Sequence, residues 1–356
     1  MSARDVWTLG WIAVGGHASQ LIEHWDGAAW MILRLPTPPQ SAITSLRAIT
    51  ARATDDVWAV GESTLTETQQ ETQAVIYHWD GSNWQLIPSP AVAGSSLWSV
   101  TAVRPDTAWA VGMVQGSHFV RRALVEYWNG QTWQVLHDPA IQRATVWLQA
   151  VSASSAQDVW AVGDAPLAPD GKHSTRQPLI LHGRSTGWEQ ITGPSGVELR
   201  SVAAWAADDV WAVGSSGFGG GEVIAHWDGA RWNAVPFPAL GPAERFNAVA
   251  ASARDDAWVV GMRQQGRPIL DPYSSLILHW DGQQWHNLPS PSPSEQTYFT
   301  AAAGLGNQEL WTVGETRPAH WTVDGALDKG TFGLHQVEDP AQGVIAHFVS
   351  APCWFR

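Results

Sequence analysis

The segments Asp56-Val57-Trp58-Ala59-Val60-Gly61 and Ile76-Tyr77-His78-Trp79-Asp80-Gly81-Ser82-Asn83-Trp84 decide the fold, because each is one copy of a phrase that recurs along the chain. The first phrase occurs seven times, with its tryptophan at Trp7, Trp58, Trp109, Trp160, Trp211, Trp258 and Trp311. The first five of these tryptophans are 51 residues apart. The 356 residues are therefore read as repeats rather than as two or three unrelated domains.

The second phrase follows each first phrase after a gap of variable length. Its paired tryptophans are Trp25 and Trp30, Trp79 and Trp84, Trp128 and Trp133, Trp227 and Trp232, and Trp280 and Trp285. Two copies are degraded: His182-Gly183 leads to Trp188, and His320-Trp321 leads to Phe332. The variable gap predicts a loop that differs from one repeat to the next.

Each repeat resolves into four short strands, which we call A to D. Strand A has the pattern Leu-x-Ala/Ser-Val/Ile-x-Ala, as in Leu46 to Ala51, strand B is the first phrase, and strand C ends at the His-Trp pair. The Asp-Gly dipeptide after strand C favours a tight hairpin. Strand D begins at the next tryptophan and ends at prolines, which cannot donate to a ladder. Four strands in about fifty residues, seven times over, predict an all-β, seven-bladed β-propeller with four-stranded blades.

The two ends of the chain are expected to share a blade. The chain enters the repeat at strand B, and residues 346–351 fit the pattern of strand A. We therefore predict one domain over residues 1–356, with its ring closed by pairing of the N- and C-terminal segments, which removes open sheet edges. The predicted blades are 344–356 plus 1–36, then about 45–90, 96–139, 147–193, 198–238, 245–291 and 298–340.

The Asp-Gly-x-x-Trp turn resembles a shortened Asp-box, the hairpin of sialidase-like and photosystem-assembly-type propellers. The spacing of the repeats is also similar to that of kelch-type propellers. The resemblance covers the whole chain and implies the propeller architecture. In those families the Asp-box lies on the face away from the active site, so the resemblance implies no catalytic residue here.

Composition excludes several classes of partner. The formal net charge is −13, and only Lys172 and Lys329 are lysines, so a nucleic-acid or membrane-surface role is not expected. Cys353 is the single cysteine and forms no intramolecular disulfide. No leader precedes Asp5 and no apolar run reaches membrane-spanning length, so we expect a soluble, monomeric chain without cofactor. The compartment is left open, with secretion or the cell surface compatible if a leader has been removed.

The recurrent residues have structural interpretations. Most of the 24 tryptophans occupy the two phrases, where large flat groups suit packing between blades. Six strand C histidines should each make a hydrogen bond within their own blade rather than converge on a metal. They are His24, His78, His182, His226, His279 and His320. Acidic pairs such as Asp55-Asp56 are interpreted as caps of the turn between strands A and B.

One position departs from the repeat and is the candidate ligand site. The second residue of strand A varies from blade to blade, and only arginine occurs twice: Arg47, Trp98, Gln149, Arg200, Asn247, Thr300 and His347. Because strand A lines the channel of a propeller, these side chains should ring its mouth, with Trp147, Arg245 and Tyr298 beside them. Arginine, amide and indole groups suit a polar ligand with flat apolar faces, such as a sugar. The alternative is a water-filled channel lined by soluble residues. The variable loops between strands B and C should share this face.

Three functions are carried forward. The first is a non-catalytic propeller that binds carbohydrate or protein through the loop-rich face and the channel mouth. The second is a hydrolase or lyase that uses Glu62, Asp164 and Glu315, which follow the glycine of strand B, together with His347. A carboxylate pair acting on a glycosidic bond must lie about 5–9.5 Å apart. The third is a structural scaffold whose partners attach through the long loops.

Overall fold

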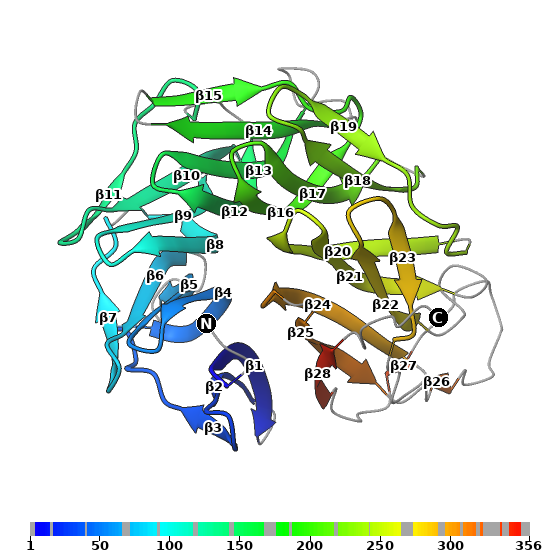
Figure 1. The fold of residues 1–356 in the computed structure, drawn as a ribbon. Helices are drawn as coiled ribbons and strands as arrows, with labels where there is room; N and C mark the ends of the chain where they lie inside the picture. The colour runs from blue at the N-terminus through cyan, green and yellow to red at the C-terminus, as the bar shows by residue number, and fades with distance from the viewer. Residues whose placement is uncertain are drawn as a thin grey trace, which may run out of the picture.

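The computed structural model describes residues 4–14, 17–39, 41–65, 72–90, 93–116, 120–141, 146–166, 176–184, 187–216, 220–241, 243–264, 273–290, 296–306, 309–317, 321–322, 335–336 and 342–349. Every regular element among them is a strand, and none of these residues belongs to a helix able to cross a membrane. The strands form separate antiparallel sheets that stand around a common centre, as blades of a propeller (Figure 1).

Five sheets have four strands in sequential order. The first two are β4 (Ser41–Ala53), β5 (Asp56–Leu65), β6 (Thr72–Trp79) and β7 (Trp84–Ile87), then β8 (Ser95–Arg104), β9 (Thr107–Gln115), β10 (Arg121–Trp128) and β11 (Trp133–Val135). The third and fourth are β12 (Trp147–Ser155), β13 (Asp158–Pro166), β14 (Arg176–Arg184) and β15 (Gly187–Ile191), then β16 (Glu198–Ala206), β17 (Asp209–Ser215), β18 (Glu222–Trp227) and β19 (Trp232–Val235). The fifth is β20 (Ala243–Ala253), β21 (Asp256–Gln264), β22 (Tyr273–Trp280) and β23 (Trp285–Leu288). The predicted A-B-C-D order is confirmed in all five.

The sheets at the two ends of the chain have three strands each. The first sheet is β1 (Val6–Val14), β2 (His17–Trp25) and β3 (Trp30–Leu33), and the last is β24 (Gln296–Gly304), β25 (Glu309–Arg317) and β28 (Gln342–Val349). A separate pair joins β26 (Trp321–Thr322) to β27 (His335–Gln336). The prediction of seven complete four-stranded blades was therefore wrong for the described residues. Six sheets have an inner strand (β4, β8, β12, β16, β20 and β24), and the first sheet has none.

The predicted pairing of the chain ends is also not observed, because β28 pairs with β25 instead of β1. The sequence explains the difference, since Val344-Ile345-Ala346-His347-Phe348 matches the strand C segment Val223-Ile224-Ala225-His226-Trp227 in all but its last residue. The register agrees, because His347 lies opposite Trp311 as His226 lies opposite Trp211. Residues 344–348 thus supply strand C of the last sheet. The segment at Trp321, expected in that place, lies in β26, and His320 and Phe332 fall outside the described residues.

A β-bulge at the same place in each inner strand explains the glycine of the first phrase. In β4 the register shifts between Leu46 and Ala48, and the other five inner strands shift at the matching position. The bulge brings the inner-strand carbonyl against the glycine of strand B. A Cβ atom on Gly61, Gly112, Gly163, Gly214, Gly261 or Gly314 would lie 1.9 to 2.1 Å from that oxygen. A side chain at these positions would displace the inner strand.

Tryptophans pack neighbouring sheets together, as the sequence predicts. The strand B tryptophan of one sheet contacts the tryptophan pair of the next sheet. Trp58 of β5, for example, lies 5.1 Å from Trp128 and 5.2 Å from Trp133 between ring centroids. Trp58, Trp160, Trp211 and Trp258 are at most 1 % exposed, so these rings form the centres of the inter-sheet cores. At roughly 25 cal/mol per Å² of apolar surface, burying each ring contributes several kcal/mol.

Candidate functional site

The six bulged residues of the inner strands lie at one end of the ring. They are Arg47, Trp98, Gln149, Arg200, Asn247 and Thr300, and we call them the mouth residues. The residue before each is a buried leucine or phenylalanine, whereas the bulged residue itself is half-buried or exposed. Because a bulge re-aims the side chain at the extra residue, the apolar neighbour stays in the core and the mouth residue reaches solvent.

Most mouth residues are held by a polar neighbour. Arg47 donates to Glu62 Oε1 at 2.7 Å, and Gln149 donates to Asp164 Oδ1 at 2.9 Å. Both acids follow the glycine of strand B directly. Trp98 Nε1 donates to Ser96 Oγ at 2.8 Å within β8, and the hydroxyl of Thr300 donates to the Val313 carbonyl at 3.2 Å. These bonds fix side-chain direction before any ligand arrives.

A larger network joins three sheets at the mouth. The guanidinium of Arg200 donates to Glu222 Oε2 at 2.8 Å and to Ser215 Oγ at 2.7 Å. The same oxygen of Glu222 accepts the backbone N–H of Phe246 from the next sheet at 2.9 Å. Asn247 then donates to the carbonyl of Phe299 in the last sheet at 2.7 Å. Arg200 and Asn247 therefore connect consecutive inner strands β16, β20 and β24.

Glu222 is the residue of this network that the sequence reasoning missed. Its side chain is only 6 % exposed, and desolvation raises its pKa, opposed by the charge of Arg200 and the N–H of Phe246. The sequence signal was the position of Glu222 at the start of strand C, directly after the glycines at 219–221, where we expected only a flexible loop.

Four predicted ligand residues remain, and the three whose side chains are described have varied surroundings. Arg121 places its guanidinium 4.9 Å from the ring centroid of Trp147, a cation–π contact between β10 and the inner strand β12. Arg245 is exposed and its Nε donates to Asn247 Oδ1 at 3.2 Å. The hydroxyl of Tyr298 donates to Glu315 Oε2 at 2.7 Å. The side chain of His347 lies outside the described residues.

The acids proposed for catalysis are distributed over three sheets. Glu62 lies in β5, Asp164 in β13 and Glu315 in β25, and each accepts a hydrogen bond from an inner-strand residue of its own sheet. In each of these sheets the acid on strand B thus supports a side chain of the inner strand in the same way. Glu62 and Asp164 accept from the mouth residues Arg47 and Gln149, and Glu315 accepts from Tyr298.

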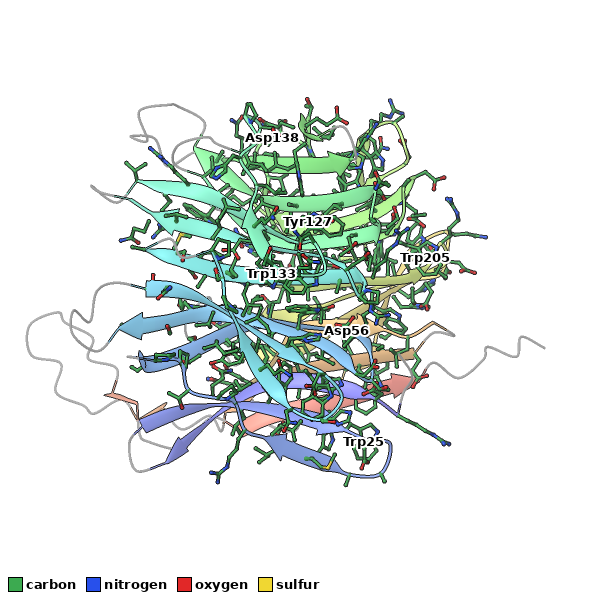
Figure 2. The ribbon with its side chains drawn as sticks, turned by 90° about the vertical axis from the view of Figure 1, so that its left-hand side faces the viewer. Trp25, Asp56, Tyr127, Trp133, Asp138 and Trp205 are labelled. Carbon is green, nitrogen blue, oxygen red and sulfur yellow. The ribbon has the colours of Figure 1, made fainter. Side chains whose placement is uncertain are left out.

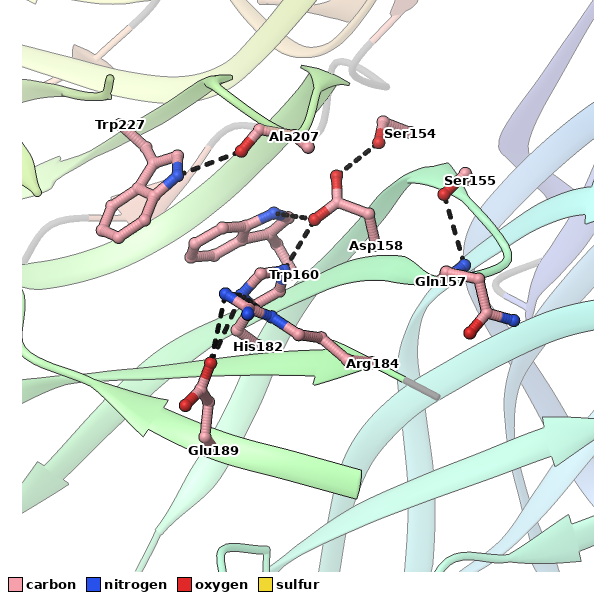
Figure 3. A network of polar contacts seen from close by, with 10 residues as sticks. All are labelled: Ser154, Ser155, Gln157, Asp158, Trp160, His182, Arg184, Glu189, Ala207 and Trp227. Atoms are coloured by element: carbon pink, nitrogen blue, oxygen red, sulfur yellow. Dashed lines mark hydrogen bonds and ion pairs between the residues drawn. The ribbon is translucent and has the colours of Figure 1, made fainter. Parts of the chain in front are cut away.

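Histidines of strand C make the predicted hydrogen bond within their own sheet, and the partner is the aspartate that opens strand B. Figure 3 shows one example, in which His182 Nε2 lies 2.6 Å from Asp158 Oδ1 and Trp160 Nε1 donates to the same oxygen at 3.1 Å. The imidazole also stacks on the indole, with centroids 3.9 Å apart. Asp5–His24, Asp56–His78, Asp209–His226 and Asp256–His279 repeat the contact at 2.7 to 3.0 Å.

This contact corrects the interpretation of the acidic pairs. In Asp55-Asp56, Asp208-Asp209 and Asp255-Asp256 we expected both acids to cap the turn between strands A and B. The second acid instead binds histidine within the sheet, and only the first lies in the turn. No group of three histidine, cysteine, aspartate or glutamate side chains in the described part of the chain is arranged to hold a metal ion.

Comparison with known proteins identifies the fold and no family. No family model and no curated protein match this sequence. A puromycin-hydrolysing peptidase of Mycobacterium tuberculosis is 12% identical, with a TM-score of 0.56 over 88% of this chain and 48% of that one. The GH74 xyloglucanase of Xanthomonas campestris is 13% identical, with a TM-score of 0.53 over 89% and 54%. YCF48 bound to D1 peptide is 15% identical, with a TM-score of 0.50 over 83% and 82%. At these identities the likeness shows the propeller fold alone.

Proposed function

We propose that this chain is a non-catalytic binding propeller, acting as one domain, whose mouth residues recognise a carbohydrate. The observation that carries the proposal is the contrast between two adjacent positions of the inner strand, the buried residue before the bulge and the bulged residue itself. The buried position before the bulge is leucine or phenylalanine in all six sheets, while the bulged position carries five different polar or aromatic side chains, with only arginine used twice. A scaffold needs no such variety at solvent-accessible positions.

The chemistry of the mouth residues suits sugar rings. Trp98 offers an indole face for stacking, and its N–H is already satisfied by Ser96. Arg47 pairs with Glu62, and Arg200 pairs with Glu222, so these charges balance. The mouth therefore presents fixed hydrogen-bond donors and acceptors rather than an electrostatic potential of one sign. Among the similar solved propellers, one is a xyloglucanase and another was solved with a bound peptide. The test must therefore distinguish a carbohydrate ligand from a protein ligand.

The test is a screen of glycan and peptide arrays with three proteins. They are the wild type, the mouth variant Arg47→Ala/Trp98→Ala, and the matched control Trp205→Ala/Arg254→Ala. Trp205 is 46 % exposed and the Arg254 side chain 62 % exposed, and they lie at or beside the turns between strands A and B, at the other end of the inner strands. Figure 2 shows Trp205 at one flank of the stacked sheets.

Binding of glycans by the wild type and the control, with at least a tenfold loss in the folded mouth variant, is the expected result. Binding of peptides alone with the same pattern would move the ligand class to protein. Loss in the control variant alone, or no binding on either array, would overturn the assignment of the site to the mouth residues.

A further inference from the structure

The first sheet offers an open edge where the other sheets have an inner strand. Strand β1 pairs with β2, and none of the described residues pairs with its other edge. Figure 1 shows β1 at the inner end of its sheet, where β4 and β24 stand in the sheets on either side. Such an edge presents a row of backbone N–H and C=O groups that can template an additional strand.

A second observation is the glycine that faces this edge. Gly10 is the first-phrase glycine of β1, equivalent to Gly61 and Gly261. In the other six sheets a Cβ at this position would collide with the inner-strand carbonyl, whereas a Cβ on Gly10 would meet no atom within 4 Å. Strand β1 thus has the glycine that a bulged neighbour requires, and none of the described residues fills the space in front of it.

A third observation is a buried carboxylate oxygen. Asp5 Oδ1 accepts from Trp7 Nε1 at 2.9 Å and pairs with His24 at 2.8 Å, while Asp5 Oδ2 is buried and has no hydrogen-bond partner among the described residues. The side chain of Asp5 is only 9 % exposed. A buried acceptor left unsatisfied is unfavourable, so a donor brought to it contributes to binding.

Equivalent aspartates show what the missing donor would be. The second oxygen of Asp256 accepts from Ser252 at 2.5 Å, and the second oxygens of Asp56 and Asp158 accept from Arg52 and Ser154. All three donors lie on inner strands, six residues after the leucine or phenylalanine that faces the glycine. Asp209 is the informative exception, because its second oxygen also lacks a partner and the inner strand there carries Trp205.

We propose that the inner edge of β1 binds an extended segment of another polypeptide as a fourth, antiparallel strand. The segment has a large apolar residue opposite Gly10, followed by a bulged residue and then by small or β-branched residues. A serine or arginine stands six residues after the large apolar residue. Main-chain hydrogen bonds supply affinity, and the glycine and Asp5 supply specificity. The six described inner strands are each paired within their own sheets, so in a second copy of this chain they are not free to be donated.

The test uses the chain's own inner-strand sequence as probe. A fluorescent peptide of residues 246–253, Phe-Asn-Ala-Val-Ala-Ala-Ser-Ala, is titrated against the full chain by anisotropy, and amide exchange is followed by mass spectrometry. We expect one saturable site, a rise in Tm and slower exchange in β1. The peptide with Ser252→Ala should bind about tenfold more weakly, because it leaves Asp5 Oδ2 unsatisfied. A scrambled peptide should not bind.

The matched protein variant is Gly10→Ala, which should fold normally and lose peptide binding because the methyl group occupies the place of the incoming carbonyl. Equal binding by Gly10→Ala, or protection outside β1, overturns the proposal. So does a β1 whose amides are already protected without peptide, since the chain itself would then fill the edge. The variant Arg47→Ala/Trp98→Ala should still bind the peptide, so failure here and failure of the carbohydrate site are distinguishable.

Discussion

At the residue scale, the glycine of the first phrase has a steric role that the sequence alone did not reveal. The sequence shows a glycine at a fixed place in seven copies, and its reason is the carbonyl of a bulged neighbouring strand. A repeated glycine in a strand indicates a close approach of backbone. Which strand approaches, and that one copy has no such neighbour, required the structure.

Replacing Gly112 by alanine should therefore be strongly destabilising, while Gly10→Ala should be close to neutral. The Cβ at Gly112 would lie 2.0 Å from the Ser96 oxygen, and the Cβ at Gly10 would contact nothing within 4 Å. We expect a loss of about 3 kcal/mol for the first and less than about 0.5 kcal/mol for the second. Urea unfolding measures both, and equal losses would contradict the bulge as the cause.

Glu126 is a buried carboxyl group between two sheets. Its side chain on β10 is 0 % exposed and accepts from Ser89 Oγ, which follows β7, at 3.0 Å. Burial raises the pKa of Glu126 from 4.5 to about 7, and the hydrogen bond from Ser89 only partly opposes the shift. The folded protein therefore holds a proton here that the unfolded chain releases near pH 4.5.

Stability should fall as the pH rises from about 4.5 to about 7, and then level. Ionisation of Glu126 lowers the free energy of the unfolded state over this pH range, while the folded state keeps its proton. The free energy of unfolding therefore falls by at most about 3 kcal/mol in total. Glu126→Gln should remove this loss, so that its Tm exceeds that of the wild type at pH 8 but not at pH 4. Ser89→Ala retains the carboxyl group and should retain the pH dependence. A wild type with flat stability between pH 4.5 and 7 would contradict the shift.

At the element scale, the sheets are joined mainly by tryptophan packing, supplemented by serine side chains of the inner strands. Ser99 on β8 accepts the N–H of Val151 on β12, and Ser201 on β16 accepts the N–H of Val249 on β20, both at 3.1 Å. Trp211 on β17 contacts Trp280 and Trp285 of the next sheet at 5.0 and 5.1 Å. The apolar contact is expected to dominate the free energy of the interface.

Two tryptophans of one sheet allow a matched comparison. Trp211 is 1 % exposed and Trp205 is 46 % exposed. Trp211→Ala should lower the free energy of unfolding by about 3–5 kcal/mol, and Trp205→Ala by less than about 1 kcal/mol. Denaturant titration gives both values. Similar losses would mean that Trp205 is packed in solution.

Sequence reasoning succeeded where a local pattern sufficed and failed where partners are distant. The two phrases and their turns identified strands B, C and D, and the Asp-Gly turns carry the expected positive φ, 93° at Gly81. The mouth residues could be selected because they vary within a fixed pattern. The role of residues 344–348 was misread, because residues 346–351 also fit the strand A pattern and the closer match to strand C was overlooked. The partners of Asp56 and Glu222 lie 22 residues away on other strands of the same sheet, so they depend on strand register rather than on a local pattern.

At the scale of the whole molecule, the last sheet packs beside the first through the same contact that joins other neighbours. Trp311 of β25 lies 6.5 Å from Trp25 and 6.1 Å from Trp30 between ring centroids. This contact brings together segments almost 300 residues apart in the sequence. It links the two ends of the chain by side chains, without the main-chain pairing that we had predicted.

A double-mutant cycle on Trp30→Ala and Trp311→Ala should give a coupling energy of about 1 kcal/mol. The two rings meet at 73°, an edge-to-face geometry that favours such coupling. Equilibrium unfolding of the wild type, both single variants and the double variant measures it. A cycle of Trp311 with the distant Trp205 is the control. Additive effects in the first cycle would show that the two end sheets are apart in solution.

The tryptophan contacts also have a direction. Trp7 of the first sheet packs on Trp79 and Trp84 of the second, Trp58 on the pair of the third, and Trp311 on the pair of the first. Five sheets make this contact in the same direction, so each of these sheets has two unlike faces and they are joined head to tail within one chain. No single interface between two sheets determines the total number of sheets. The number of sheets in the ring depends instead on the angle between neighbouring sheets. Gain or loss of a whole repeat would therefore leave the residues of every remaining interface unchanged.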